Sequence, residues 1–467
     1  MPLTQWKFVF LRLIIVQILN KYKEMTLETI EISNFRCFTN YTINLAPKVS
    51  VLIGRNGAGK TSLLRAIRYA LGFVFSTEKK LGDELLVAGN EDVKMEQISG
   101  NDFFSTTFNG IPATSTSIHT IAKYLGETLD WTLSRRNVVG ENADVSKYMG
   151  AYHRFMKAFK DNDTLPVYAY FSDSFPHKEG GLTEFAKTQL GSYDKTLRTF
   201  GYDQWDKEPS YSYMWLIRWL NAIIRDVQTN HADAYSHEEA NYITLKLIQA
   251  SVPVNKDCDD SFQITTPLFN IKDDKSMELW LRMKSGNDIL FQNLPAGYLR
   301  LYSIVLDICC RHWILNHDSK KEPVGVVIID EVDLHLHPTL AVEVVERLTR
   351  TFPKIQFILS THSPLVVSNI KTNTTENKIF RMVYGENKPH EVADIYGLDY
   401  NIALQTVMDG SASNGVTDYL RSSILRNMRQ GRNDLVEQKK SELKALVSEV
   451  RFQAIMENIE KSFKENH

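Results

Sequence analysis

A glycine loop constrains the fold of this chain more than any other feature. The segment Gly54-Arg-Asn-Gly-Ala-Gly59-Lys60-Thr61 follows a short apolar run at 49–53 and precedes a stretch whose apolar residues have helical spacing. It fits G-x-x-x-x-G-K-[S/T] at every fixed position, between a strand and a helix, which is the context that a phosphate-binding loop requires. A glycine-rich turn that binds nothing is the plain alternative, but chance matches seldom have both flanks.

The loop assigns a role to each of its positions. The backbone N–H groups of residues 56–59 can surround phosphates because glycine has no side chain to block their approach. Lys60 would bridge the outer phosphates of ATP, and Thr61 would be a ligand of Mg2+. The segment therefore predicts ATP binding with Mg2+.

A second motif combines an apolar strand with two acids. Residues 326–329 are Val-Val-Ile-Ile, and Asp330 and Glu331 follow directly. A Walker B strand presents its carboxylates in this way, so Asp330 fits the Mg2+ ligand and Glu331 fits the general base that polarises the attacking water. Alone, such a pair is often a solvated turn; downstream of a phosphate-binding loop it predicts a catalytic site.

A third motif follows one helix and one strand later. The apolar strand at 356–360 ends in the polar segment Ser360-Thr361-His362-Ser363-Pro364. A lone histidine is usually structural, but at this position its imidazole can reach the γ-phosphate and orient Glu331 and water. His362 is therefore a candidate catalytic residue.

With these motifs the chain resembles the ABC-class ATPases of the overcoming-lysogenization-defect, RecF and SMC group. The resemblance rests on residues 330–338 and 360–364 and covers about residues 25–410. In that group a signature motif precedes Walker B, and residues 293–300 take its place here. The resemblance implies that this loop meets the γ-phosphate on the opposite subunit, so head-to-tail pairing of two heads completes two sites.

Position 295 departs from the pattern of the group, because proline replaces the usual serine. Proline offers neither a hydroxyl nor a backbone N–H to the γ-phosphate. The amides of Ala296 and Gly297 at the start of the next helix can still hold an anion. We therefore expect ATP-dependent pairing with slow hydrolysis.

The resemblance implies two further site residues. Arg36, in Asn34-Phe35-Arg36, corresponds to an early strand turn and would approach the nucleotide, with an ordinary exposed strand arginine as the alternative. Gln97 is the best candidate for the glutamine loop and hence for a further Mg2+ ligand. The complete set of expected nucleotide-binding residues is Arg36, Asn56, Gly57, Ala58, Gly59, Lys60, Thr61, Ser62, Ala296 and Gly297.

Local periodicity predicts an α/β fold with a parallel sheet. The expected strands lie at 29–32, 42–45, 49–53, 166–170, 324–330 and 356–360, and the expected helices at 60–72, 214–227, 296–317 and 339–352. Residues 77–292 contain no sustained heptads, which predicts a compact insertion lobe in a P-loop ABC-type ATPase head and excludes a long coiled-coil arm. The expected regions are an N-terminal extension (1–24), a first head segment (25–76), the insertion lobe (77–292), a second head segment (293–410) and a helical tail for assembly or partner binding (411–467).

Composition narrows the function classes. The formal net charge of -2 provides no global positive field, so DNA contact would need a local patch or a complex. The four cysteines have no zinc-ligand spacing, which predicts a reduced cytoplasmic protein with no zinc site. The apolar stretch at 8–19 is too short to span a bilayer, so we interpret residues 1–24 as an extended reading frame or a docking helix.

Three functions remain open. Within the group, the chain is similar to the Septu-type anti-phage ATPases (PtuA) and to retron ATPases, which implies a separate, PtuB-like HNH endonuclease gated by the nucleotide state. Sequence after 396 has no acid cluster for a nuclease site of its own. The alternatives are a RecF-like ATPase that clamps duplex DNA and an ATP-binding scaffold with little turnover. The insertion argues against a transporter subunit.

Overall fold

The computed structural model describes residues 25–75, 98–104, 113–136, 138, 146–172, 184–191, 196–206, 212–255, 260–272, 277–408 and 415–464. These divide into two compact units, with the boundary between Leu398 and Asp399. The expectations for residues 1–24 and for Gln97 lie outside the described residues. None of the described helices is both long and apolar enough to cross a membrane.

The first unit contains a parallel sheet built from apolar runs. Its order is β13 (His390–Val392), β12 (Asn377–Arg381), β3 (Val49–Ile53), β11 (Ile355–Ser360), β10 (Gly325–Ile329) and β6 (Val167–Phe171). All pairs are parallel except β12 with β13. Every residue of β3, β6, β10 and β11 is buried, as expected for strands covered on both faces. The predicted strands at 49–53, 166–170, 324–330 and 356–360 are thus confirmed.

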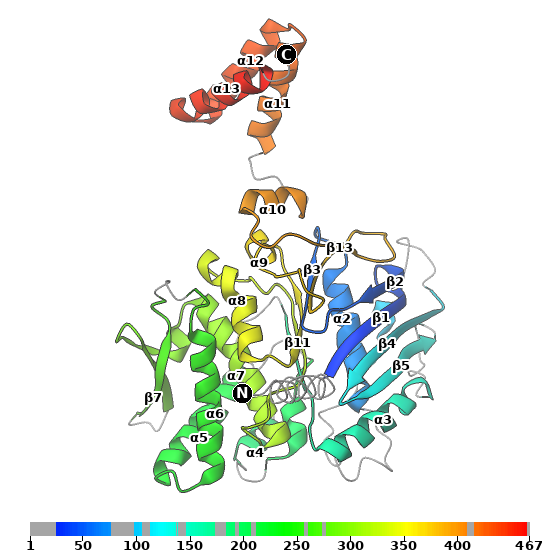
Figure 1. The fold of residues 1–467 in the computed structure, drawn as a ribbon, viewed down its shortest axis with the longest axis vertical. Helices are drawn as coiled ribbons and strands as arrows, with labels where there is room; N and C mark the ends of the chain where they lie inside the picture. Colours follow the sequence, from blue (N-terminus) through cyan, green and yellow to red (C-terminus); the bar gives the residue numbers. More distant parts are fainter. Residues whose placement is uncertain are drawn as a thin grey trace, which may run out of the picture. The chain divides into compact units, whose positions relative to one another are not determined.

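A second, antiparallel sheet packs beside the first. Its order is β2 (Phe38–Asn44), β1 (Met25–Phe35), β4 (Ser115–Tyr124) and β5 (Glu127–Arg136). Alternating buried and exposed residues along β4 show that one face is covered. Helix α2 (Lys60–Leu71) lies between the two sheets, and the indole of Trp131 on β5 donates a 3.0 Å hydrogen bond to the carbonyl of Ala70 (Figure 1).

Helices α7 (Ala296–Asn316) and α8 (Pro338–Thr351) cover the opposite face of the parallel sheet (Figure 1). Helix α7 is buried almost all round because further helices pack on its outer side. These are α5 (Ser212–Gln228) and α6 (Ala234–Ser251), and α5 donates a 2.6 Å hydrogen bond from Trp215 to Asp307 of α7. The predicted helices are therefore confirmed within two residues at each end.

The range 77–292 is more closely joined to the head than the sequence interpretation assumed. Three of its strands, β4, β5 and β6, belong to the two head sheets. Strand pairing is set by partners distant in the sequence, so local periodicity found β6 without locating it. The other elements are α3 (Ser146–Asn162), α4 (Glu184–Gly191), α5, α6 and the three-stranded sheet of β7 (Ile264–Ile271), β8 (Met277–Met283) and β9 (Asp288–Leu290). Short helices complete the unit at Gly72–Phe75, Gly100–Asp102, Arg198–Tyr202, Phe291–Asn293 and α9 (Pro364–Val367).

The second unit is helical. It contains α10 (Tyr400–Thr406), α11 (Gly415–Arg429), α12 (Asn433–Leu446) and α13 (Glu449–Lys464). Helices α11, α12 and α13 share a small apolar core: Leu420, Ile424, Val436, Leu443, Met456 and Ile459. Several large apolar side chains of this unit are exposed, among them Leu446 at 59% and Val450 at 83%.

Candidate functional site

The strand order brings the three sequence motifs to one edge of the parallel sheet. Strand β11 lies between β3 and β10, and all three run in the same direction. The glycine loop follows β3, the acidic pair follows β10, and the Ser360–His362 segment follows β11. Ligands of open α/β sheets bind outside the carboxyl ends of the strands, so the motifs converge where a ligand site is expected.

The glycine loop adopts a conformation that other residues would strain. Gly54, Gly57 and Gly59 have φ values of 145°, 81° and 99°. A Cβ at position 59 would lie 2.7 Å from Cζ of Phe38 and 2.9 Å from Sγ of Cys37, whereas one at position 57 would meet nothing within 4 Å. Gly59 is thus required by close packing against the β1–β2 turn, while Gly57 leaves the outer side of the loop open to a ligand.

The side chain of Lys60 folds back onto the glycine loop and donates hydrogen bonds to its backbone carbonyls. Its Nζ donates hydrogen bonds of 2.9 Å to the Gly54 carbonyl and 3.3 Å to the Arg55 carbonyl. Burial lowers the pKa of this ammonium, and the nearby carboxylates of Asp330 and Glu331 oppose that shift. The cation is therefore held at the loop by carbonyl dipoles and two acids, at the position from which phosphate oxygens would draw it.

Asp330 and Thr61 face each other across the sheet edge. Oγ1 of Thr61 donates a 2.9 Å hydrogen bond to Oδ2 of Asp330, and the hydroxyl of Ser360 donates to Oδ1. Asp330 is only 3% exposed, while Thr61 is exposed. A hydroxyl and a carboxylate oxygen, both hard donors, are thus preorganised side by side as expected for a Mg2+ site.

Ser360 also fixes the backbone of Glu331. Its Oγ accepts a 2.8 Å hydrogen bond from the N–H of Glu331, and its carbonyl accepts one of 2.9 Å from Val332. Glu331 has φ of 50°, a left-handed conformation that is unfavourable for glutamate and is maintained by such contacts. Sequence reasoning assigned no role to Ser360, because its contacts follow only from the adjacency of β10 and β11.

Arg300 provides a second restraint on the acidic pair. Its Nη2 donates hydrogen bonds of 3.0 Å to the Asp330 carbonyl and 3.1 Å to the Glu331 carbonyl. The side chain is 1% exposed and comes from the first turns of α7. The signature segment is therefore connected directly to the Walker B residues of the same chain, a connection that sequence reasoning missed.

In the segment after β11, Thr361 is buried in a hydrogen-bond network and His362 is exposed. The hydroxyl of Thr361 donates to Oδ1 of Asp333 and accepts a 2.9 Å hydrogen bond from the Ser363 N–H. His362 is exposed, and its ring forms no hydrogen bond with the described residues. The imidazole is thus free to meet a ligand.

The signature helix begins without a side-chain cap. Pro295 is the N-cap residue of α7, and the first backbone hydrogen bond runs from the Leu299 N–H to its carbonyl at 3.0 Å. The N–H groups of Ala296 and Gly297 precede that bond and have no partner within the helix. A Cβ at Gly297 would lie 3.0 Å from the His335 carbonyl, so the helix start packs closely against the loop after Walker B.

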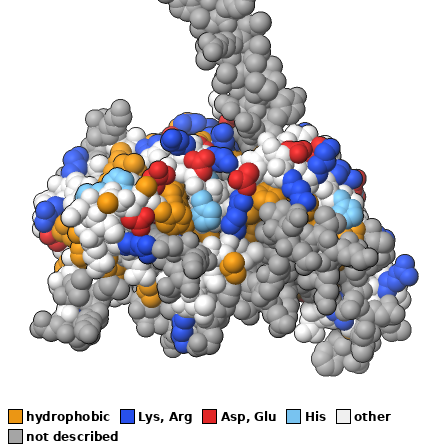
Figure 2. Space-filling view, turned by 90° about the horizontal axis from the view of Figure 1, so that it is seen from below, with side chains coloured by type: hydrophobic (Ala, Val, Ile, Leu, Met, Phe, Trp, Pro, Cys, Tyr) orange, Lys and Arg blue, Asp and Glu red, His pale blue; other side chains and the backbone are white. Residues whose placement is uncertain are grey.

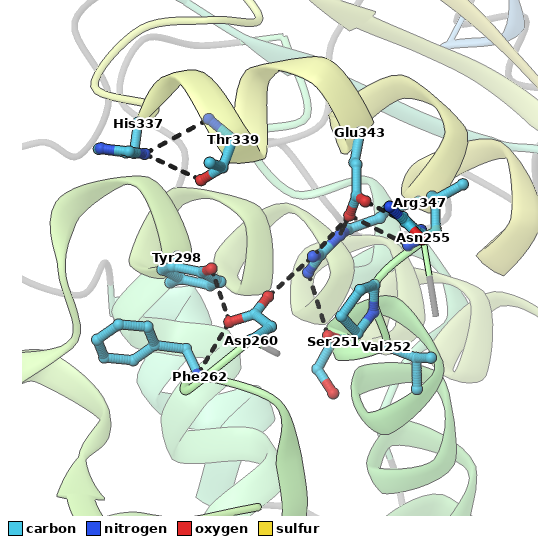
Figure 3. Close-up of polar contacts among 12 residues, drawn as sticks. Ser251, Val252, Asn255, Asp260, Phe262, Tyr298, His337, Thr339, Glu343 and Arg347 are labelled. Carbon is cyan, nitrogen blue, oxygen red and sulfur yellow. Dashed lines mark hydrogen bonds and ion pairs between the residues drawn. The ribbon is translucent and has the colours of Figure 1, made fainter. Parts of the chain in front are cut away.

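A buried polar network joins α7 to α8 just behind this start (Figure 3). The hydroxyl of Tyr298 donates a 2.7 Å hydrogen bond to Asp260, which pairs with Arg347 of α8 at 2.8 Å. Arg347 also pairs with Glu343 at 2.8 Å, and these two carboxylates raise the pKa of its guanidinium against the opposing effect of burial. The network borders a cavity of about 320 Å³ and fixes the position of the signature turn.

Arg36, expected to approach the nucleotide, contacts Asp102 in this structure. Its Nη1 is 3.4 Å from Oδ1 of Asp102, and its N–H donates to the Asp102 carbonyl at 2.7 Å. Asp102 is 1% exposed and also accepts 2.9 Å and 2.8 Å hydrogen bonds from the hydroxyls of Tyr69 and Ser99. Arg36 has φ of 52°, so this tight turn and Asp102 together determine its direction.

Two protein-family models match the chain. One, described as an AAA domain, matches residues 29–199. The other, described as an AAA domain of a putative AbiEii toxin of a type IV toxin–antitoxin system, matches residues 284–368. Together they include the glycine loop, the acidic pair and the histidine segment.

The chain is also similar to curated ATPases. It is 25% identical over 409 residues to the retron Vc95 probable ATPase of Vibrio cholerae serotype O1 biovar El Tor, covering 76% of this chain and 73% of the relative. It is 22% identical over 353 residues to the Septu protein PtuA of Bacillus thuringiensis, covering 75% and 74%. Among solved structures, the SMC head domain from Thermotoga maritima aligns with 79% of this chain and 100% of its own, at 14% identity and a TM-score of 0.41.

Proposed function

We propose that this chain, an ABC-type P-loop ATPase related to the retron ATPases and to PtuA, is the ATP-hydrolysing subunit of an anti-phage defence complex. In this proposal two heads pair around ATP, and the nucleotide state gates a separate HNH endonuclease. The observation that carries it is the Thr61–Asp330–Ser360–Glu331 chain of hydrogen bonds at the carboxyl edge of the sheet. Nuclease activity belongs to the partner and not to this chain.

The residues present fit ATP with Mg2+. The open outer side of Gly57 leaves room for phosphates at the loop amides, and Lys60 would exchange the carbonyls of Gly54 and Arg55 for phosphate oxygens. Thr61 and Asp330 would hold the cation, which neutralises phosphate charge when bound. Ser62 lies beside the loop, where its hydroxyl forms a hydrogen bond with Cys37.

Catalysis then depends on Glu331. Its carboxylate would accept a proton from the attacking water as the γ-phosphate bond breaks, and His362 would orient that water and the γ-phosphate. Ser360 and Arg300 hold the backbone on both sides of Glu331, so the base needs little reorganisation. Gln97 remains a proposed Mg2+ ligand, and Arg36 a proposed nucleotide contact that would have to leave Asp102.

The uncapped start of α7 supports the proposed pairing of heads. The N–H groups of Ala296 and Gly297 would receive the γ-phosphate of the opposite head, and Pro295 removes the hydroxyl that would strengthen this contact. This favours a long-lived paired state with slow turnover, which suits a gate. It also supports the alternative of an ATP-binding scaffold that hardly hydrolyses.

A RecF-like DNA clamp is the other alternative. On the face shown in Figure 2, Lys and Arg side chains are interspersed with Asp, Glu and hydrophobic side chains and do not gather into one basic patch. This face therefore offers no single basic patch for the DNA backbone.

Co-purification tests the proposal. We would tag this chain, express it with its native flanking genes and identify the stable complex by mass spectrometry. The proposal expects a small HNH protein, and recovery of the chain alone would contradict it. DNA cleavage by the purified chain alone would contradict the division of labour.

Site variants test the chemistry in the same complex. Lys60→Ala should abolish ATP binding, whereas the exposed control Lys388→Ala should bind normally. Glu331→Gln should bind ATP, lose turnover and accumulate paired heads, whereas Glu346→Gln, at a surface pair with Lys371, should not. Parental turnover in Glu331→Gln would remove this residue from the role of base.

A further inference from the structure

A carboxylate and two imidazoles converge at the turn that joins α5 to α6. Asp226 lies in the last turn of α5, His231 in the connecting turn and His237 in the first turns of α6. Nδ1 of His231 is 2.9 Å from Oδ2 of Asp226, and Nδ1 of His237 is 2.9 Å from Oδ1. The three ligand atoms all lie within 4.8 Å of one another, so one small ion can reach them together.

Asp226 is a largely buried carboxylate at a helix end that favours a cation. The residue is 7% exposed and sits at the C-terminal end of a helix, where the helix dipole disfavours an anion. Its neighbour Arg225 is directed to Asp233, with Nε 2.8 Å from Oδ2. Within the described part of the chain, the polar contacts of the carboxylate are those with the two imidazoles.

We propose that Asp226, His231 and His237 bind a divalent transition-metal ion, with Zn2+ as the best match. Two imidazole nitrogens and a carboxylate oxygen are donors that Zn2+ prefers, and water can complete the coordination because His231 is 62% exposed in its side chain. Ligands in a tetrahedron with metal distances of about 2.05 Å lie about 3.3 Å apart. Each imidazole Nδ1 lies 2.9 Å from a different oxygen of Asp226. To admit the ion, these contacts must open by about 0.4 Å and the carboxylate must turn to present one oxygen to it.

A further residue is placed to support the ligands. Nε2 of His237 is 2.9 Å from the side-chain amide of Asn241, one turn further along α6. When Nδ1 binds a metal, Nε2 carries the proton and requires an acceptor. The Asn241 amide provides one when it turns over to present its oxygen, so the same residue orients His237 in both states.

The site would stabilise a hairpin that supports the signature helix. Buried Arg218 of α5 pairs with Glu239 of α6 at 2.8 Å, and Trp215 of α5 bonds to α7. The connecting turn contains His231 at φ of 62° and lies beyond these contacts. A metal there fixes the connecting turn of the hairpin, independently of nucleotide chemistry.

Zinc titration of the full chain tests the assignment. Chelator-treated protein, free of nucleotide and Mg2+, is titrated with ZnCl2 against a chromogenic zinc indicator. The wild type should bind one equivalent more than the double variant His231→Ala/His237→Ala, and Zn2+ should raise the melting temperature of the wild type only. His390→Ala, an exposed histidine paired with a single carboxylate, should behave as the wild type.

Equal zinc binding and equal thermal shifts in the wild type and the double variant would overturn the proposal. The single variant His231→Ala shows whether misfolding explains the loss of zinc binding. The His231 side chain is largely in solvent, so its removal should leave the fold intact. Circular dichroism confirms that this variant is folded, and it should show the same loss of one equivalent.

Discussion

Replacement of Arg300 should alter the position of Glu331, the proposed catalytic base, without altering nucleotide binding. The guanidinium donates to the carbonyls of Asp330 and Glu331, which follow β10 and lie outside the phosphate-binding loop at 54–61. In Arg300→Met both carbonyls lose a charged donor at a site that is 1% exposed. At about 1.5 to 3 kcal/mol for each hydrogen bond to a charged group, the variant should lose about 3 to 6 kcal/mol of unfolding free energy.

Turnover should fall more than binding does. Glu331 holds a left-handed conformation, so loss of a restraint on its carbonyl lets the backbone relax and moves the carboxylate. A misplacement that costs about 1.4 to 2.7 kcal/mol in the transition state lowers kcat about 10-fold to 100-fold. In the proposed function the glycine loop and Lys60 set the affinity for ATP, so the binding free energy should change by less than about 0.6 kcal/mol, or about threefold in Kd.

The assay compares kcat per folded molecule, ATP affinity by calorimetry and urea unfolding. Arg311→Met is the matched control: it is also buried on α7, but it pairs with Asp307 at 2.6 Å and donates to carbonyls outside the site. Arg311→Met should have a lower unfolding free energy, while its kcat per folded molecule should equal that of the wild type. If Arg300→Met retained wild-type kcat, or if both variants lost turnover equally, the positioning argument would fail.

Three further predictions address other regions of the chain. Gly59→Ala should abolish ATP binding in calorimetry, since its Cβ would lie 2.7 Å from Phe38 at φ of 99°; Gly57→Ala, with an unobstructed Cβ, should lose less. Burial lowers the pKa of His312 from 6.5 to about 4, so between these pH values the unfolded chain binds a proton that the folded chain does not. The unfolding free energy should therefore fall by up to about 3 kcal/mol as the pH drops from 6.5 to 4. In His312→Gln, urea unfolding should no longer show this loss, which would identify His312 as its cause. Deletion after residue 410 should reduce complex mass in light scattering while leaving ATP affinity unchanged, and an unaltered complex would exclude an assembly role for Leu446 and Val450.

The sequence predicted motif residues well because each motif is local. The loop at 54–61 and the strand before Asp330 have flanks that can be recognised within about ten residues. The structure brings Thr61 and Asp330 into contact, while their Mg2+ roles stay predictions. Ser360 and Asp102 were missed because their importance depends on partners far away in the chain. The same limit applied to β6, whose burial was apparent from its apolar run while its partner β10 was not.

The restraints on the site also suggest how Pro295 is tolerated. In one head, the start of α7 is fixed by the Tyr298–Asp260–Arg347 network and by contact of Gly297 with the loop after Walker B. A phosphate bound at this start would therefore meet N–H groups that are already oriented, and no ordering entropy would offset the contact. Through Arg300 the same helix turn holds the Glu331 backbone. If a second head's nucleotide occupied this turn, as we propose, it would act on the backbone of the proposed base in the same head. We therefore expect turnover to respond to pairing even though residue 295 has no hydroxyl.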